Sequence, residues 1–325
     1  MAVQFFTSSN PLGSTFRLLG QFRKQEKALT SGPNVKTAID EYNRLHSTES
    51  ADERNANYKI LVNSYYDLAT LFYEWGWGSS FHFAHRQKFE SFAESIRKHE
   101  YFLASKLNLT KEKRDNDVKL HILDVGCGIG GPMRNICRFT GCDITGITLN
   151  EYQVRRGNEL CINEFGSNPP CRSIQGDFMK MEKLESDSFD AAYAIEATCH
   201  APNRATCYRE IFRVLKPGAI FACYEWCVTD KYNPKNSDHC LIKKQIEEGD
   251  GLPDLAATSV CSEALVEAGF ELLEEGDMAL AKAHYPWYLP LTPSWNPFTQ
   301  RFQFNWLGLK LTKYALKTME FLWLA

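Results

Sequence analysis

The chain has 325 residues, of which 44% are hydrophobic and 24% are charged, proportions typical of a globular protein. Its 37 basic and 40 acidic side chains leave a net charge of −3, which gives no electrostatic reason to expect nucleic acid as a partner. The 11 cysteines include no CxxC pair, and the sequence contains neither a secretory leader nor about 18 consecutive apolar residues. We therefore expect reduced thiols, no metal site, no secretion signal and no membrane-spanning helix.

The first 115 residues are expected to form a helical region. Between residues 58 and 73, apolar positions recur every three or four residues, which predicts an amphipathic helix. Gly76 and Gly78 would end this helix, and residues 86–107 predict another one. The segment between them, residues 73–83, is unusually rich in aromatic side chains.

From residue 116 onward, short apolar runs alternate with helical patterns. The runs predict strands at 121–125, 143–147, 171–177, 189–195, 219–229 and 270–280. The intervening patterns predict helices at 134–139, 150–165 and 203–215. This alternation predicts an α/β fold with a doubly wound parallel sheet, and we assign residues 116–280 to a cofactor-binding domain.

A glycine-rich loop, DVGCGIGG, follows the first predicted strand at residues 124–131. Glycine lets a ligand approach the backbone closely, and the amide groups at the start of the next helix bind anionic groups such as a carboxylate. The GxGxG spacing differs from the dinucleotide pattern, and no Lys-Ser/Thr pair follows it as in a triphosphate-binding loop. The loop therefore predicts a site for a nucleoside cofactor at the carboxyl ends of the strands.

The next two strands end in side chains suited to such a cofactor. Asn150 and Gln153 follow the second strand and are expected to reach ribose hydroxyls, with Glu151 as a weaker candidate. Asp177 and the adjacent aromatic residue follow the third strand and suit adenine. In order, these strand ends resemble the pattern of class I S-adenosylmethionine-dependent methyltransferases. The predicted cofactor-contacting residues are Asp124, Gly126, Cys127, Gly128, Gly130, Thr148, Leu149, Asn150, Gln153, Asp177, Phe178 and Ile195.

Three further segments resemble motifs of the sterol C-24 methyltransferase family, which includes related squalene and triterpene methyltransferases. They are YEWGWGSSFHF at 73–83, IEATCHAP at 195–202, and the stretch 243–255, which contains EEGDGLPD. The resemblance extends from about residue 42 to the end of the chain. It implies a Rossmann-like methyltransferase domain, S-adenosyl-L-methionine as cofactor, and methylation of a sterol side-chain alkene at carbon 24.

The resemblance also implies residue types for the acceptor site. The family's reaction passes through a carbocation, which aromatic faces stabilise by about 0.5–2 kcal/mol per ring. Proton removal would then fall to Glu74, Glu196 or His200, and the spacing does not choose between them. The expected acceptor-contacting residues are Tyr66, Tyr73, Trp75, Trp77, Phe81, His82, Glu225 and Asp250.

Three alternatives stay open at this point, the weakest of which is an enzyme that cyclopropanates fatty acids with the same cofactor. Trp75 stands where the family usually has Tyr or Phe, which keeps an acyclic triterpene such as squalene as an alternative acceptor. We also find no seventh strand after residue 280, although residues 281–288 could substitute, and residues 281–325 look like a shortened C-terminal substrate segment. A truncated cofactor-binding protein without catalysis is therefore the alternative from another class.

The expected partners follow from an apolar acceptor. A sterol or triterpene substrate predicts peripheral contact with a membrane. The family resemblance places the chain at the cytosolic face of the endoplasmic reticulum or another microsomal membrane. Whether the chain forms a homo-oligomer is left open by the sequence.

Overall fold

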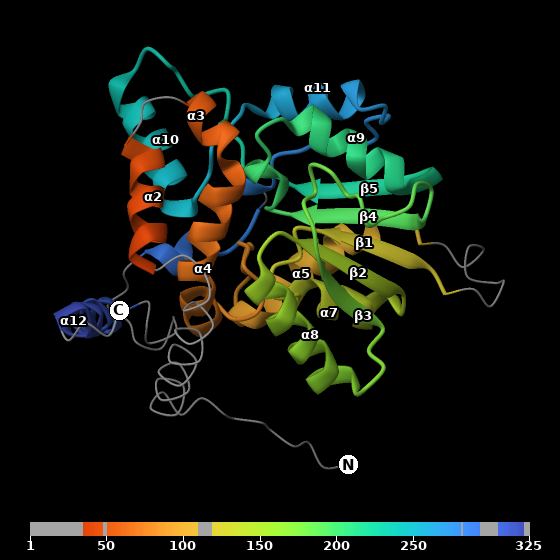
Figure 1. Ribbon diagram of the computed structural model, residues 1–325, viewed down its shortest axis with the longest axis horizontal. Helices are drawn as coiled ribbons and strands as arrows, with labels where there is room; N and C mark the ends of the chain where they lie inside the picture. The colour runs from red at the N-terminus through yellow and green to blue at the C-terminus, as the bar shows by residue number, and fades with distance from the viewer. Residues whose placement is uncertain (1–34, 48–50, 110–118, 281, 293–304, 322–325) are drawn as a thin grey trace. The chain divides into compact units, whose positions relative to one another are not determined.

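The computed structural model describes residues 35–47, 51–109, 119–280, 282–292 and 305–321 (Figure 1). Its contacts divide the chain into two compact units. One unit comprises residues 1–81 and 103–273, and the other comprises residues 82–102 and 274–325. The predicted site residues lie in the first unit, except for His82.

The first unit is built on a five-stranded parallel sheet with the order β3-β2-β1-β4-β5. The order reverses between β1 and β4, as expected for a doubly wound fold, so the predicted fold class and the first five predicted strands are confirmed. The strands are β1 (His121–Val125), β2 (Asp143–Thr148), β3 (Cys171–Gln175), β4 (Phe189–Ile195) and β5 (Leu215–Tyr224).

Helices cover both faces of this sheet (Figure 1). On one face, α9 (Arg204–Val214) and α11 (Thr258–Glu267) pack on the apolar cluster that contains Leu123 and Val125. On the other face, α7 (Gly131–Thr140) and α8 (Glu151–Phe165) pack on the cluster that contains Ile122. Successive residues of β1 therefore point to opposite cores, which explains why the strands read as continuous apolar runs.

Among the described residues of the first unit, three helices precede β1, and one more helix lies between β5 and α11. These are α2 (Val35–Ser47), α3 (Ala51–Ala56), α4 (Tyr58–Gly76) and α10 (Ser237–Asp250). The helix α4 is the predicted amphipathic helix, and it ends at the glycines, where Gly78 has a φ of +119°. Among the described helices, none has both the length and the apolarity needed to cross a membrane.

The second unit contains most of α5 (Phe92–Ser105), the short helices η2 (Met278–Leu280) and η3 (Leu289–Leu291), and α12 (Trp306–Phe321). Within this unit, Arg86 and Tyr285 form an isolated antiparallel bridge, and the Arg86 guanidinium lies 4.8 Å from the centre of the Tyr285 ring. The helix α12 lies within the predicted C-terminal substrate segment 281–325, other parts of which are outside the described residues.

The sixth predicted strand, at 270–280, is wrong. In the structure residues 271–277 are an exposed loop that leads into η2. Leu272 and Leu273 are 40% and 69% exposed, while Phe270 packs against the sheet-covering cluster. Residues 282–288 contribute only the bridge at Tyr285, so the described residues provide no replacement strand there.

Candidate active site

The glycine loop forms a backbone cradle between β1 and α7. Gly126, Gly128 and Gly130 all have positive φ, and the N–H groups of Gly126 and Cys127 donate to the carbonyl of Ile147. A Cβ on Gly126 would lie closer than 3.0 Å to the Cβ of Ala197, a separation that real Cβ atoms essentially never show. The cradle therefore requires glycine and fits a nucleoside cofactor that approaches the backbone closely.

Three of the predicted cofactor residues are held by contacts inside the protein. The Tyr193 hydroxyl donates to the Asp124 carboxylate over 2.8 Å, which ties the end of β1 to β4. The Cys127 thiol is buried, and burial raises its pKa, so it remains a protonated, unreactive group. Ile195, at the end of β4, packs in the core on the same side as Ile122. These contacts hold the loop and the adjoining ends of β1 and β4 in place.

At the end of β2, polar side chains are hydrogen-bonded to one another and to the backbone. The Asn150 side chain caps α8 by accepting from the N–H of Gln153 at 3.0 Å. The Thr148 hydroxyl donates to the Gln153 side-chain oxygen at 2.7 Å, and the Leu149 carbonyl accepts from Gln175. All three of Thr148, Asn150 and Gln153 are buried. The residues predicted to meet the ribose therefore lie together at one strand end.

The helix α4 meets this strand end along one face. Its contacting residues are spaced three and four apart, and their partners on α8 are spaced three apart, so each set lies on a single helix face. The pairs are Asp67 with Asn150 at 2.6 Å, Thr70 with Gln153 at 3.3 Å, and Glu74 with Arg156 at 3.1 Å. Through these pairs, α4 is held against the cofactor domain.

The ion pair of Glu74 and Arg156 should contribute measurably to that attachment. Both carboxylate oxygens accept from the guanidinium, and the two side chains are only 20% and 19% exposed. We expect Glu74→Gln and Arg156→Gln to show a coupling free energy of about 1–3 kcal/mol in a double-mutant cycle of urea unfolding. Glu182→Gln with Lys180→Gln, an exposed pair, is the matched control. A coupling no larger than that of the control would contradict the expectation.

At the end of β3, the predicted adenine-contacting residue is held from two sides. One oxygen of Asp177 accepts from the N–H of Met179, and the other pairs with Lys59 of α4, both at 2.8 Å. Phe178 is partly buried against the core. A second part of α4 therefore contacts a predicted cofactor residue.

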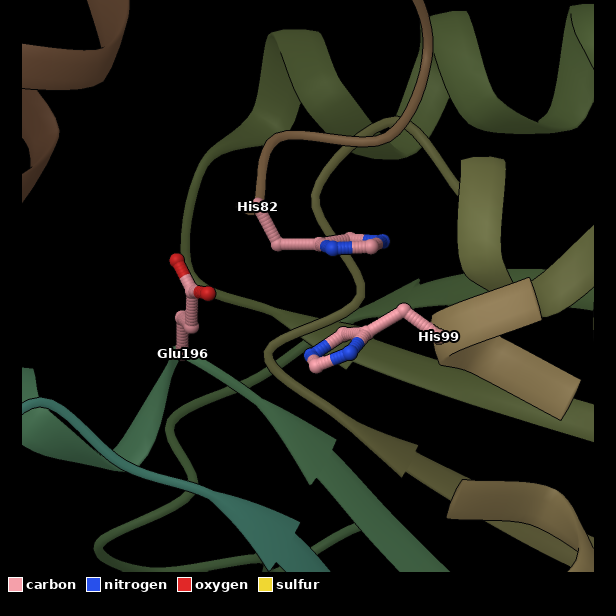
Figure 2. Close-up of side chains that lie close together, drawn as sticks. All are labelled: His82, His99 and Glu196. Atoms are coloured by element: carbon pink, nitrogen blue, oxygen red, sulfur yellow. The ribbon is translucent and has the colours of Figure 1, made fainter. Parts of the chain in front are cut away.

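Glu196 follows β4 in a strained backbone conformation. Its φ is +51°, which is uncommon for a residue other than glycine and is found preferentially at functional sites. The indole N–H of Trp226 donates to the Glu196 carboxylate at 2.9 Å, and the backbone N–H of Glu196 donates to the carbonyl of Tyr224. Figure 2 shows the Glu196 side chain extending from the end of this strand. A carboxylate is therefore held firmly beside the glycine loop, next to Ala197.

His200 ends the short helix η1 (Thr198–His200), and its hydrogen bonds indicate which ring nitrogen carries the proton. Its Nδ1 lies 3.1 Å from the carbonyl oxygen of Gly251 and its Nε2 lies 3.0 Å from the hydroxyl of Tyr66. Because a carbonyl only accepts, Nδ1 carries the proton, and the neutral ring accepts from Tyr66 at Nε2. Burial lowers the pKa of His200 to about 4. His200 is therefore a neutral imidazole at pH 7.

Aromatic residues of α4 and the following segment contact one another in a series that begins at Tyr66, the partner of His200. The hydroxyls of Tyr65 and Tyr73 lie 2.6 Å apart, and the rings of Tyr73 and Phe81 have centroids 5.2 Å apart. Phe81 also borders Gly128, where an added Cβ would lie 3.7 Å from its ring. The aromatic segment therefore reaches the cofactor loop. Trp77 is buried at the end of α4, and the side chain of Trp75 lies outside the described residues.

Two more predicted acceptor residues are carboxyl groups in apolar surroundings. Glu225 accepts from the Thr198 hydroxyl, and burial raises its pKa to about 8. Burial raises the pKa of Asp250 to about 6. At pH 7 Glu225 is largely a neutral acid, whereas Asp250 is largely ionised.

His82 belongs to the second unit, where it forms a buried pair. Its Nε2 lies 3.1 Å from the carboxylate of Glu100, and its Nδ1 lies 2.9 Å from the carbonyl of Phe83. The rings of His82 and His99 lie one beside the other (Figure 2), stacked with a centroid separation of 5.6 Å. Burial lowers the pKa of His99 to about 3, so that ring is neutral. Within this unit, His82 joins the aromatic segment to α5.

Several residues of the site were missed in the sequence. Asp67, Thr70 and Arg156 join α4 to α8, and the Gly251 carbonyl holds His200. Gly251 itself has a φ of +64° and an added Cβ would touch the ring of Tyr65. The available signal for the α4 residues was the helical spacing of its polar positions.

Comparisons with known proteins identify the family. A methyltransferase-domain model matches residues 123–223. The chain is 50% identical to cycloartenol-C-24-methyltransferase of Arabidopsis thaliana over 296 residues, 90% of this chain and 84% of that protein. It is 42% identical to the sterol 24-C-methyltransferase of Saccharomyces cerevisiae over 301 residues, 89% and 76% of the two chains.

A solved structure agrees on the fold. Geranyl diphosphate C-methyltransferase of Streptomyces coelicolor A3(2) superimposes with a TM-score of 0.52 and 18% identity, over 65% of this chain and 78% of that one. The chain is therefore a methyltransferase that uses S-adenosylmethionine, and it belongs to the sterol C-24 methyltransferase family.

Proposed function

We propose that this enzyme methylates the side-chain alkene of a sterol at carbon 24, with cycloartenol as the first acceptor to test. The observation that carries the proposal is the contact of the aromatic residues of α4 with the residues that follow β4, through Tyr66 and His200. The names of the relatives, cycloartenol-C-24-methyltransferase and sterol 24-C-methyltransferase, support a sterol acceptor. They give no support to squalene.

The residues present can divide the chemistry between them. When bound, S-adenosylmethionine supplies an electrophilic methyl group, whose uptake by the acceptor alkene leaves a carbocation on the acceptor. Gly126, Gly128 and Gly130 would hold the cofactor with Asn150 and Asp177. The rings of Tyr73 and Phe81 offer aromatic faces that stabilise positive charge and exclude water.

Proton removal from the acceptor requires a base in its unprotonated form. His200 is unprotonated at pH 7, and because its Nε2 lone pair accepts from Tyr66, a proton would reach it through the Tyr66 hydroxyl. Glu196 remains a second candidate, held by Trp226 beside the glycine loop. Glu74, the third, is held in its ion pair with Arg156, an arrangement that favours a role in positioning α4.

The acceptor can be identified by one assay. Labelled cofactor would be incubated with cycloartenol, lanosterol, zymosterol and squalene side by side, and the products would be analysed by mass spectrometry. We expect at least one sterol to gain a methyl group at carbon 24 and squalene to remain unchanged. Turnover of squalene alone would contradict the proposal. The Gly126→Ala enzyme, in which the cofactor cradle is obstructed, serves as the negative control.

We also propose that the enzyme works as a peripheral protein at the cytosolic face of the endoplasmic reticulum, because its apolar acceptor partitions into membranes. We expect cell fractionation to recover the chain in the microsomal pellet and alkaline carbonate to release it. Recovery entirely in the high-speed supernatant would argue against this location.

A further inference from the structure

The end of β2 lacks a feature that doubly wound folds commonly use. In these folds, an acidic side chain near the end of the second strand accepts hydrogen bonds from the ribose hydroxyls of a nucleoside cofactor. Here β2 ends at Thr148 and is followed by Leu149 and Asn150. The first acidic residue after β2 is Glu151, and its side chain is exposed on the first turn of α8. The strand end itself therefore offers amides and a hydroxyl, but no buried carboxylate.

A carboxylate reaches this strand end from another part of the chain. Asp67 of α4 lies with its Oδ1 2.6 Å from the side-chain nitrogen of Asn150. One turn along α4, Thr70 contacts Gln153, so the helix is aligned at this position by two consecutive contacts. Asn150 is 2% exposed, Gln153 is 2% exposed and Thr70 is fully buried. Asp67 therefore belongs to a polar cluster that is largely closed to solvent.

The hydrogen bonds within this cluster assign different roles to its members. The Asn150 side-chain oxygen already accepts from the N–H of Gln153, and its nitrogen donates to Asp67. Asn150 therefore orients Asp67. A carboxylate has about four acceptor positions on its two oxygens, so a bond from Asn150 is compatible with further donors. A ribose supplies two neighbouring hydroxyl donors, which match the two oxygens of a carboxylate.

We propose that Asp67 binds the ribose hydroxyls of S-adenosylmethionine, taking the place of the acid that the strand end lacks. Its partial burial is consistent with this role. Removal from water raises the pKa of Asp67, because burial disfavours the charged form, and the hydrogen bond from Asn150 offsets part of this effect. The cofactor site is then composed of two distant segments, the sheet domain and α4. This inference concerns the cofactor and does not depend on which acceptor is methylated.

A thermodynamic cycle with ligand analogues tests the assignment. S-Adenosylhomocysteine and its 2′-deoxy and 3′-deoxy analogues would be titrated by calorimetry into the wild type and into Asp67→Asn. We expect the wild type to lose about tenfold or more in affinity when a contacted hydroxyl is removed. We expect Asp67→Asn to bind S-adenosylhomocysteine about tenfold or more weakly than the wild type does. In this variant, removing the ribose hydroxyl from the ligand should cause a much smaller further loss of affinity.

Matched variants separate this role from simple attachment of α4. Glu74→Gln weakens another contact on the same helix face. Its affinity should still fall as much as that of the wild type when a ribose hydroxyl is removed from the ligand. The exchange Asp67→Asn with Asn150→Asp keeps one carboxylate and one amide in the pair, so it provides a folded variant if the single substitution misfolds. Equal weakening of all three ligands by Asp67→Asn, or no weakening, would overturn the proposal. No acceptor is present, so a wrong choice of sterol would not affect the result.

Discussion

Replacing Gly126 by alanine is expected to reduce the affinity for S-adenosylhomocysteine by about 100-fold, or roughly 2.7 kcal/mol. The residue has a φ of +80°, and the added Cβ would lie closer than 3.0 Å to Ala197. Ala197 directly follows Glu196, which is already strained at a φ of +51°. The displacement would therefore disturb both the cofactor loop and the segment that carries the candidate base. Calorimetric titration would measure the effect.

The matched control is Gly141→Ala at the end of α7. Gly141 has a similar φ of +71°, but an added Cβ there would meet nothing within 4 Å. In both variants an alanine must adopt the left-handed backbone conformation, which destabilises the fold by about 1–2 kcal/mol. Only the first should lose the cofactor. Equal cofactor affinity in the two variants would show that the contact with Ala197 is easily relieved.

Acidification is expected to destabilise the enzyme through His200. Burial places its pKa at about 4 in the folded state, against 6.5 in the unfolded state. Between these values the unfolded chain binds the proton, so the free energy of unfolding falls as the pH decreases from about 6.5 to about 4. A difference of this size corresponds to about 3 kcal/mol over the whole window. Urea unfolding at pH 7 and at pH 4.5 would measure most of it.

Substitution of the histidine should remove this part of the pH dependence. The variant His200→Gln is expected to be less stable at pH 7, because it disturbs the bonds to Tyr66 and Gly251, but to lose less stability on acidification. His284→Gln, at an exposed position, is the control and should keep the wild-type slope. An unchanged slope in His200→Gln would show that other groups, such as the partly buried His99, govern the acid response.

The sheet was predictable because its strands are locally encoded. Ile122 and Leu123 are both fully buried in cores on opposite faces of the sheet, and such strands are visible as apolar runs between turn residues. The run at 270–280 resembled them, with Phe270, Leu272 and Leu273. Whether such a run joins a sheet depends on a partner strand, which sequence periodicity does not report. In the structure only Phe270 of these three packs against the core.

The site was predictable in its local parts only. Gly126, Asn150 and Glu196 follow strands directly, so the fold places them at one edge of the sheet. Asp67 is different, because its contact with Asn150 spans 83 residues of sequence. In the sequence, Asp67 is a polar position of an amphipathic helix, a pattern that predicts exposure to solvent. Only the docking of α4 shows that this face meets α8.

The same long-range contacts bear on how the enzyme is made. Tyr66 contacts a residue 134 positions later, and Tyr65 contacts a carbonyl 184 positions later. At about 5–20 residues per second, a ribosome needs roughly 10–40 s to synthesise that stretch. The helix α4 is therefore translated well before the residues that it contacts. Until then its tyrosines are exposed to chaperones and to other nascent chains, and slow folding of this segment is expected to limit the yield of active enzyme.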